Sequence, residues 1–177
     1  ARYAPDLFPE LEKETGVSTG FRKTGSLTLA LSDERLEEIA RNASMARAFN
    51  VEVDVVTTAD VERLYPILNT DGVTGAIYMP NDGQADPTNI TQAFAKGARM
   101  NGARVLENTK VTAVNVDGDR VVGVSYERDG EPGEIRSDYV VNCAGMWARE
   151  LGAMSGVNIP LHACEHFYIV TEPVAEL

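Results

Sequence analysis

The chain has 177 residues, 44% of them hydrophobic, which is enough for a folded globule with a sizeable core. Its formal net charge of −11 disfavours binding to nucleic acid or to an anionic membrane surface through a general electrostatic field. No apolar run approaches membrane-spanning length, and residues 1–5 lack the pattern of a secretory signal.

The first predicted elements are a strand and a helix. Residues 21–31 alternate as a strand does, with Leu27, Leu29 and Leu31 on one face. Ser32 is a good N-cap and is followed by two acidic residues, which the helix dipole favours in the first turn. The apolar face of this helix should consist of Leu36, Ile39, Ala40, Ala43 and Ala46.

Three shorter elements and a long helix come next. We expect a β-rich segment, a helix that Pro66 ends and a strand, at residues 51–56, 58–65 and 75–79. After a turn at residues 80–83, Asp86 and Pro87 suit the N-cap and first position of a helix that ends near Asn101. Its buried stripe should be Ile90, Ala93, Phe94, Gly97 and Ala98.

An antiparallel meander is predicted in the second half of the chain. A strand at residues 103–106 should precede three others, at residues 111–116, 121–126 and 134–141. Asp117-Gly118 should turn the first pair, and Asp129-Gly130 with Pro132-Gly133 the second. This order is typical of the second half of a dinucleotide-binding domain, in which the strand ending at Cys143 would run parallel to residues 103–106.

That last strand ends in Asn142-Cys-Ala-Gly145 and passes directly into a helix-like pattern with Trp147, Leu151 and Met154 on one face. Small residues at such a turn let a phosphate or ribose approach the backbone, and the N–H groups that open a helix favour an anion. Ordinary packing turns have the same pattern. No G-x-G triplet occurs among the 15 glycines, so the phosphate-binding fingerprint is absent and both ends of the chain look cut.

A final strand is predicted near the C-terminus. Its alternation puts both histidines, His162 and His166, on one face with Cys164, Tyr168 and Val170. The opposite, mostly apolar face should pack on the core, and it consists of Leu161, Ala163, Glu165, Phe167 and Ile169. A metal site is not expected, because structural zinc needs a closed ligand set and no second cluster exists. The histidines are either ordinary surface or core residues or face a cofactor cavity. Cys143 and Cys164 are expected to be buried free thiols.

Five motifs from about Phe21 onward carry a resemblance: Gly25-Ser-Leu27, Asp82-Gly-Gln-Ala-Asp-Pro87, Gly97-Ala98 with Gly102-Ala103, Val140-Val-Asn-Cys-Ala-Gly145 with Trp147, and Glu165-His-Phe-Tyr-Ile-Val-Thr-Glu172. Together they resemble the FAD-dependent amine oxidoreductases of the D-amino acid oxidase superfamily. The last motif is the sharper pointer to one branch, that of dimethylglycine and sarcosine dehydrogenases.

The resemblance implies roles for six residues. The backbone of Val111 would meet the adenine of FAD, and Ala144, Gly145 and Trp147 would lie against the ribose and pyrophosphate. His166 and Tyr168 would face the flavin and act on the substrate, since histidine changes charge near neutral pH and can bias the protonation of an amine. Without the resemblance, Val111 is an ordinary core valine and Trp147 is equally a half-buried helix residue.

The resemblance also implies a fold and a function for the whole protein. The fold class is α/β (α+β): residues 1–85 and the return strand at 159–177 belong to a substrate domain with a mixed or antiparallel sheet, and residues 86–158 form the second half of a Rossmann-like FAD domain. The chain is then a fragment that binds FAD weakly or not at all by itself.

The implied reaction is oxidation of a small N-methyl amine in the cytoplasm or mitochondrial matrix, with an electron-acceptor protein and folate as possible partners. Alternatives are a glycine or D-amino acid oxidase, and a non-catalytic binding domain on the same scaffold.

Overall fold

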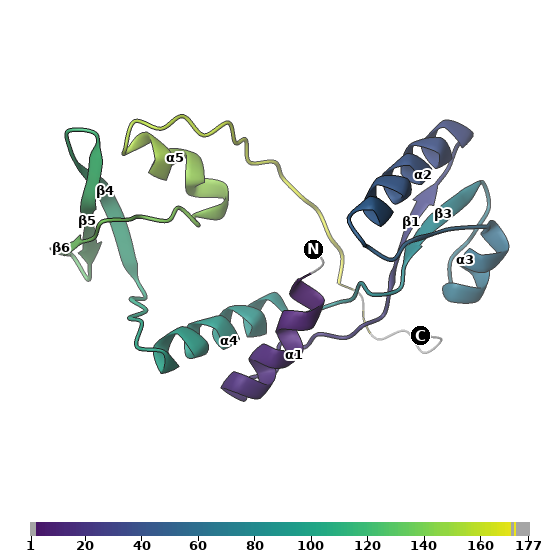
Figure 1. Cartoon of the computed structure of the whole chain (residues 1–177), viewed down its shortest axis with the longest axis horizontal. Helices are drawn as coiled ribbons and strands as arrows, with labels where there is room; N and C mark the ends of the chain where they lie inside the picture. The colour runs from purple at the N-terminus through teal and green to yellow at the C-terminus, as the bar shows by residue number, and fades with distance from the viewer. Residues whose placement is uncertain (1–2, 171, 173–177) are drawn as a thin grey trace. The chain divides into compact units, whose positions relative to one another are not determined.

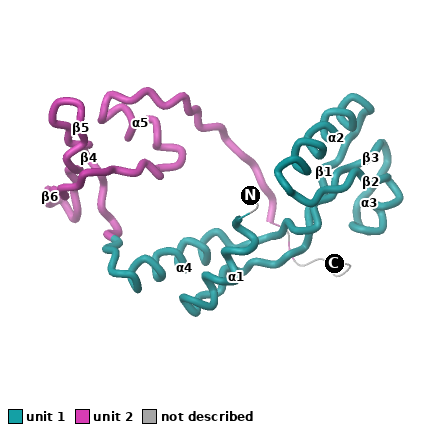
Figure 2. The backbone as a smooth tube through the Cα atoms, in the orientation of Figure 1, with its two compact units in different colours: residues 1–105, 173–177 teal, residues 106–172 magenta. Residues whose placement is uncertain are grey.

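The computed structural model describes residues 3–170 and residue 172, and it divides into two compact units (Figure 2). The first unit runs to Val105 and the second comprises Leu106–Glu172. Helices and antiparallel sheets together agree with the expected α/β (α+β) class. No described helix combines the length and the apolar composition that crossing a bilayer requires.

The first unit is built around a small antiparallel sheet. Strand β3 (Gly75–Met79) lies between β1 (Ser26–Ala30) and β2 (Asp54–Val56) and pairs with both. Helix α2 (Asp33–Ala48) lies along β1 and β3, and α3 (Thr58–Leu64) contacts β3 (Figure 1). The core between them consists of Ala30, Ile39, Ala43, Val53 and Ile77, with Leu36, Ala46 and Met79 at its edge.

Most predicted elements of this unit are confirmed, but the first strand is shorter than expected. Strand β1 starts only at Ser26, and the preceding Arg22 makes a single bridge to Gln84. Leu31 is 70% exposed and does not share a buried face with Leu27 and Leu29. The reason is that the strand ends at Ala30, and Leu31 lies in the bend between it and Ser32, the residue that caps α2.

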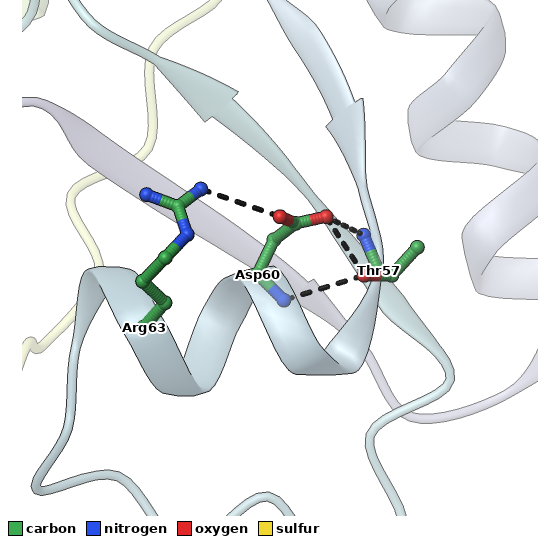
Figure 3. Close-up of polar contacts among 3 residues, drawn as sticks. All are labelled: Thr57, Asp60 and Arg63. Carbon is green, nitrogen blue, oxygen red and sulfur yellow. Dashed lines mark hydrogen bonds and ion pairs between the residues drawn. The ribbon is translucent and has the colours of Figure 1, made fainter.

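Side chains fix the starts of the helices. The Ser32 hydroxyl accepts the Arg35 N–H at 3.2 Å and caps α2 as predicted. At α3, Thr57 and Asp60 form a reciprocal capping box (Figure 3): Asp60 Oδ2 accepts the Thr57 hydroxyl at 2.7 Å and the Thr57 N–H at 3.1 Å, and Thr57 Oγ1 accepts the Asp60 N–H at 3.3 Å. The Thr57 hydroxyl, followed by its N–H and by Arg63, holds the pKa of the Asp60 carboxyl below its ordinary value.

Two further helices of the first unit pack together (Figure 1). Helix α1 (Ala4–Thr15) was not predicted, although it has a proline in its first turn and the left-handed Gly16 after its last residue. Helix α4 (Pro87–Met100) begins as predicted, with Asp86 accepting the Asn89 N–H at 3.0 Å. Ala93 and Gly97 are buried, but the expected burial of Phe94 is wrong, because α1 covers only one side of α4 and leaves Phe94 45% exposed.

The second unit contains the predicted antiparallel meander. Its strands β4 (Thr109–Asp117), β5 (Arg120–Arg128) and β6 (Glu131–Arg136) pair in chain order. Asp129 and Gly130, with φ of 54° and 83°, turn β5 into β6. The prediction that Pro132-Gly133 also belong to this turn is wrong, because both lie inside β6 and pair with β5. As an edge strand, β6 tolerates a proline.

Three predicted strands are missing or incomplete. Residues 103–106 form no strand, the strand predicted at 134–141 extends only to Arg136 in β6, and the described residues of the return strand, 159–170 and 172, have no strand structure. The predicted parallel pairing of residues 103–106 with a strand ending at Cys143 is therefore wrong. A strand exists only when a neighbour accepts and donates its backbone hydrogen bonds. Within the described ranges, no strand lies along these three segments. Residues 171 and 173–177 of the expected return strand lie outside the described residues.

Candidate functional site

The turn after residue 141 is held together by one side chain. Asn142 Oδ1 accepts the Ala144 N–H at 3.1 Å, and Asn142 Nδ2 donates to the Ala148 carbonyl at 2.9 Å. The Trp147 N–H also donates to the Ala144 carbonyl, at 3.0 Å. These bonds fold residues 142–148 into a tight loop that leads through η1 (Gly145–Trp147) into α5 (Ala148–Ala153).

Gly145 is an exposed position of this turn. Its φ is 54°, a left-handed conformation that a residue with a Cβ adopts only at a cost. A Cβ built on it would meet no atom within 4 Å, so its backbone is open to a neighbouring group. Helix α5 has only 6 residues, so its dipole adds less than the sequence pattern suggests. The open backbone of Gly145 is therefore what suits a ribose or phosphate.

Of the three other proposed cofactor residues, Ala144 and Trp147 lie in the same turn and Val111 lies in the meander. Ala144 is half-buried before Gly145, and Trp147 is 65% exposed, so its ring is available as a flat apolar surface. Val111 is half-buried in β4 opposite Tyr126, just before a register shift in the β4–β5 pairing. In the described part of the chain, no hydrogen bond joins Val111 to the turn.

The proposed substrate residues, His166 and Tyr168, are exposed. The predicted sorting of this segment into a packed and an open face is wrong: Phe167 and Ile169 are each 89% exposed, against 87% for Tyr168. The segment has no strand partner that could press one face onto a core. Neither His166 nor Tyr168 bonds to a described residue, so both side chains are available.

The two cysteines are free, as expected, but both are exposed, so the expectation that they are buried is wrong. Cys143 lies in the turn and Cys164 in the segment that lacks a packed face, and neither segment enters a core. Among residues 3–170 and 172, no three His, Cys, Asp or Glu residues are grouped so that they could hold a metal ion.

The Asp82–Pro87 motif has an architectural role that the pattern alone did not reveal. Asp82 Oδ2 accepts the Ser26 hydroxyl at 2.7 Å and its Oδ1 accepts the Gly83 N–H at 2.9 Å. A Cβ on Gly83 would collide with the Arg22 carbonyl oxygen, so only glycine fits there. The motif thus joins β1, the loop before it and the start of α4.

A surface hollow of about 690 Å³ lies beside this junction. It is lined by Glu12, Ser18, Gly20, Phe21, Arg22, Gln84, Ala85, Asp86, Pro87 and Asn89. Its two carboxylates are already engaged: Glu12 accepts hydrogen bonds from Thr19 and Ser18, and Asp86 caps α4. Both therefore serve the local fold.

Comparison with known proteins decides the family. The profile of the DAO family, described as FAD dependent oxidoreductase, matches residues 1–177. The chain belongs to this family. The resemblance in the sequence motifs is thereby confirmed, and sarcosine and dimethylglycine dehydrogenases are both among its relatives.

Two relatives and one solved structure illustrate the similarity. Human mitochondrial sarcosine dehydrogenase is 41% identical over 170 residues, which are 93% of this chain and 18% of that protein. The mouse mitochondrial pyruvate dehydrogenase phosphatase regulatory subunit is 37% identical over 175 residues, 98% of this chain and 20% of that protein. The crystal structure of L-proline dehydrogenase from P. horikoshii has a TM-score of 0.76 at 31% identity, covering 88% of this chain and 40% of that one. The chain thus spans about a fifth of the length of these curated relatives.

Proposed function

We propose that the protein containing this chain binds FAD and oxidises a secondary or tertiary N-methyl amino acid such as sarcosine or dimethylglycine. The observation that carries the proposal is the 41% identity to human sarcosine dehydrogenase over 93% of the chain. The coarser statement, an FAD-dependent oxidoreductase of the DAO family, rests on the match over all 177 residues.

The turn at residues 142–148 is the proposed contact with the ribose and pyrophosphate of FAD. Gly145 supports this assignment because its open backbone offers a close approach that a Cβ would fill. Ala144 and the exposed ring of Trp147 would flank the cofactor, and the backbone of Val111 would meet the adenine. When bound, the flavin supplies the acceptor for the hydride that leaves the substrate carbon.

His166 and Tyr168 are the proposed substrate residues. Oxidation of an amine requires its nitrogen to be unprotonated, and an imidazole can hold that proton or orient the amine. The Tyr168 hydroxyl can donate a hydrogen bond to the same substrate. Their exposure and lack of bonds to described residues support the assignment, because neither side chain is committed to the fold.

The same proposal assigns a role to each part of the chain. Residues 86–158 would serve FAD, and residues 1–85 with 159–177 would serve the substrate. We propose an electron-acceptor protein and folate as further partners. The location we propose is the cytoplasm or the mitochondrial matrix, and the mitochondrial names of several relatives support the latter.

A non-catalytic role is the second candidate, and one relative favours it: the regulatory subunit that is 37% identical to this chain. Anaerobic mixing of the purified complete protein with sarcosine, dimethylglycine or glycine separates the two. Bleaching of the oxidised flavin absorbance supports the dehydrogenase. A protein that contains no flavin, or a flavin that no amine reduces, supports the non-catalytic scaffold.

A further inference from the structure

The Asn142 side chain spans the proposed cofactor turn from end to end. Its amide oxygen receives the Ala144 N–H at 3.1 Å, which forms a local turn over the residue between them. Its amide nitrogen donates to the Ala148 carbonyl at 2.9 Å, six residues further along. One half-buried side chain thus ties the residue before Gly145 to the first residue of α5.

Few other contacts hold Gly145 in place. Its position is open on the side where a Cβ would stand, and Met146 after it is 57% exposed. Two backbone hydrogen bonds also cross this turn, from the Trp147 N–H to the Ala144 carbonyl and from the Ala148 N–H to the Gly145 carbonyl. Without Asn142, the left-handed Gly145 would rotate more freely, since glycine has the widest choice of backbone conformations.

We propose that Asn142 is a positioning residue for FAD, which holds the Gly145 backbone and the Trp147 ring in the arrangement that the cofactor meets. The inference rests on the proposed function, because it needs FAD at this turn. Asn142 itself does not need to touch the cofactor. Its two side-chain hydrogen bonds, to Ala144 and Ala148, set the shape of the loop that would contact FAD.

The donor to Ala148 is the bond to test. Asn142→Asp keeps the acceptor for the Ala144 N–H but replaces the donor with an oxygen that faces the Ala148 carbonyl. Asn142→Ser keeps an acceptor for the Ala144 N–H, adds no charge and is too short to reach Ala148. Asn158→Asp is the matched control, because Asn158 is exposed in the same unit and bonds to no described residue.

The measurement is FAD affinity of the complete protein, produced without flavin in riboflavin-starved cells and titrated with FAD. Both Asn142 variants should raise the Kd about ten- to a hundredfold, because FAD must then order a turn that wild type presents already ordered. The flavin reduction rate at saturating FAD should stay within about twofold of wild type, and Asn158→Asp should change neither quantity.

The thermal midpoint of the flavin-free protein separates positioning from folding. If the Asn142 variants lower this midpoint while the folded fraction binds FAD normally, Asn142 serves only the fold and the inference is wrong. If wild type binds FAD and both variants bind it equally well, the inference fails but the proposed function stands. A wild-type protein that binds no FAD contradicts both.

Discussion

Glu12 Oε1 accepts two hydrogen bonds from Thr19, one from its backbone N–H at 2.5 Å and one from its hydroxyl at 2.7 Å. Thr19 is completely buried, and its carbonyl accepts the N–H of Asp86 at 3.0 Å. A carboxylate on α1 thereby anchors the loop that meets the N-cap of α4.

This anchor should make the stability of the first unit depend on pH. The Thr19 hydroxyl, then the Thr19 N–H and then Ser18, hold the pKa of Glu12 below its ordinary value of 4.5. Because the folded pKa is the lower one, the contribution of Glu12 is full above the unfolded pKa and is lost as pH falls through the folded value. Glu12→Gln should therefore flatten the fall in the thermal midpoint between about pH 7 and about pH 3. Glu14→Gln is the control: Glu14 is exposed on the same helix and accepts a long hydrogen bond from Asn101 Nδ2 at 3.4 Å, so its replacement should change this fall much less. Equal slopes in both variants would refute the role of Glu12.

The capping box at α3 predicts a local loss of stability. Thr57→Ala removes both hydroxyl bonds of the Thr57–Asp60 pair (Figure 3) and should lower the free energy of unfolding by about 1 kcal/mol. Thr88→Ala is the control, since Thr88 is exposed near the start of α4 and its hydroxyl bonds to no described residue. Urea unfolding of both variants checks the difference, and an equal effect would show that the box is dispensable.

Gly145 and Gly156 allow cofactor contact to be separated from backbone strain. Both are left-handed, with φ of 54° and 74°, and a Cβ on either meets no atom within 4 Å. Alanine at either position should therefore cost about 1–2 kcal/mol of stability. Only Gly145→Ala should also weaken FAD binding, by roughly tenfold or more, because the new methyl group fills the proposed approach to the cofactor. FAD titration of both variants decides it: equal affinities would place the cofactor elsewhere.

His166→Ala should act on the reaction and not on the fold. The side chain is exposed and unbonded to described residues, so the FAD content and thermal midpoint should stay close to wild type. The rate of flavin reduction should fall roughly ten- to a thousandfold, the low to middle part of what positioned acid–base groups contribute. His162→Ala, also exposed, should change the rate much less. A wild-type rate in His166→Ala, measured by stopped-flow absorbance, would remove this residue from the mechanism.

Elements defined by local interactions were predictable from the sequence. Ser32 and Asp86 cap their helices as the pattern indicates, and β3 has the predicted bounds. Strands were predicted less accurately than helix starts, because a strand forms only beside a partner strand. Residues 103–106 have a strand-like composition but no partner strand among the described residues. Helix α1 was missed although Pro5 and Gly16 mark its ends.

The candidate site divides in the same way. The turn at Gly145 depends on local interactions, and the small residues Ala144 and Gly145 are enough to predict it from the sequence. The hydrogen bond from Asn142 to Ala148 depends on the conformation of the whole loop between them. The sequence offers only the Asn-x-Ala spacing, which is a signal of a local turn. The exposure of His166 and Tyr168 could not be inferred from alternation, which assumes a sheet to pack against.

The most direct test of the account compares amines as reductants of the bound flavin. The complete protein, purified with FAD and mixed anaerobically with sarcosine, dimethylglycine or glycine, should show flavin bleaching that is fastest with one of the two N-methyl amino acids. Glycine lacks the methyl group and should reduce the flavin much more slowly. Faster reduction by glycine would contradict the proposed substrate class, and a flavin that none of the three reduces would contradict the proposed dehydrogenase activity itself.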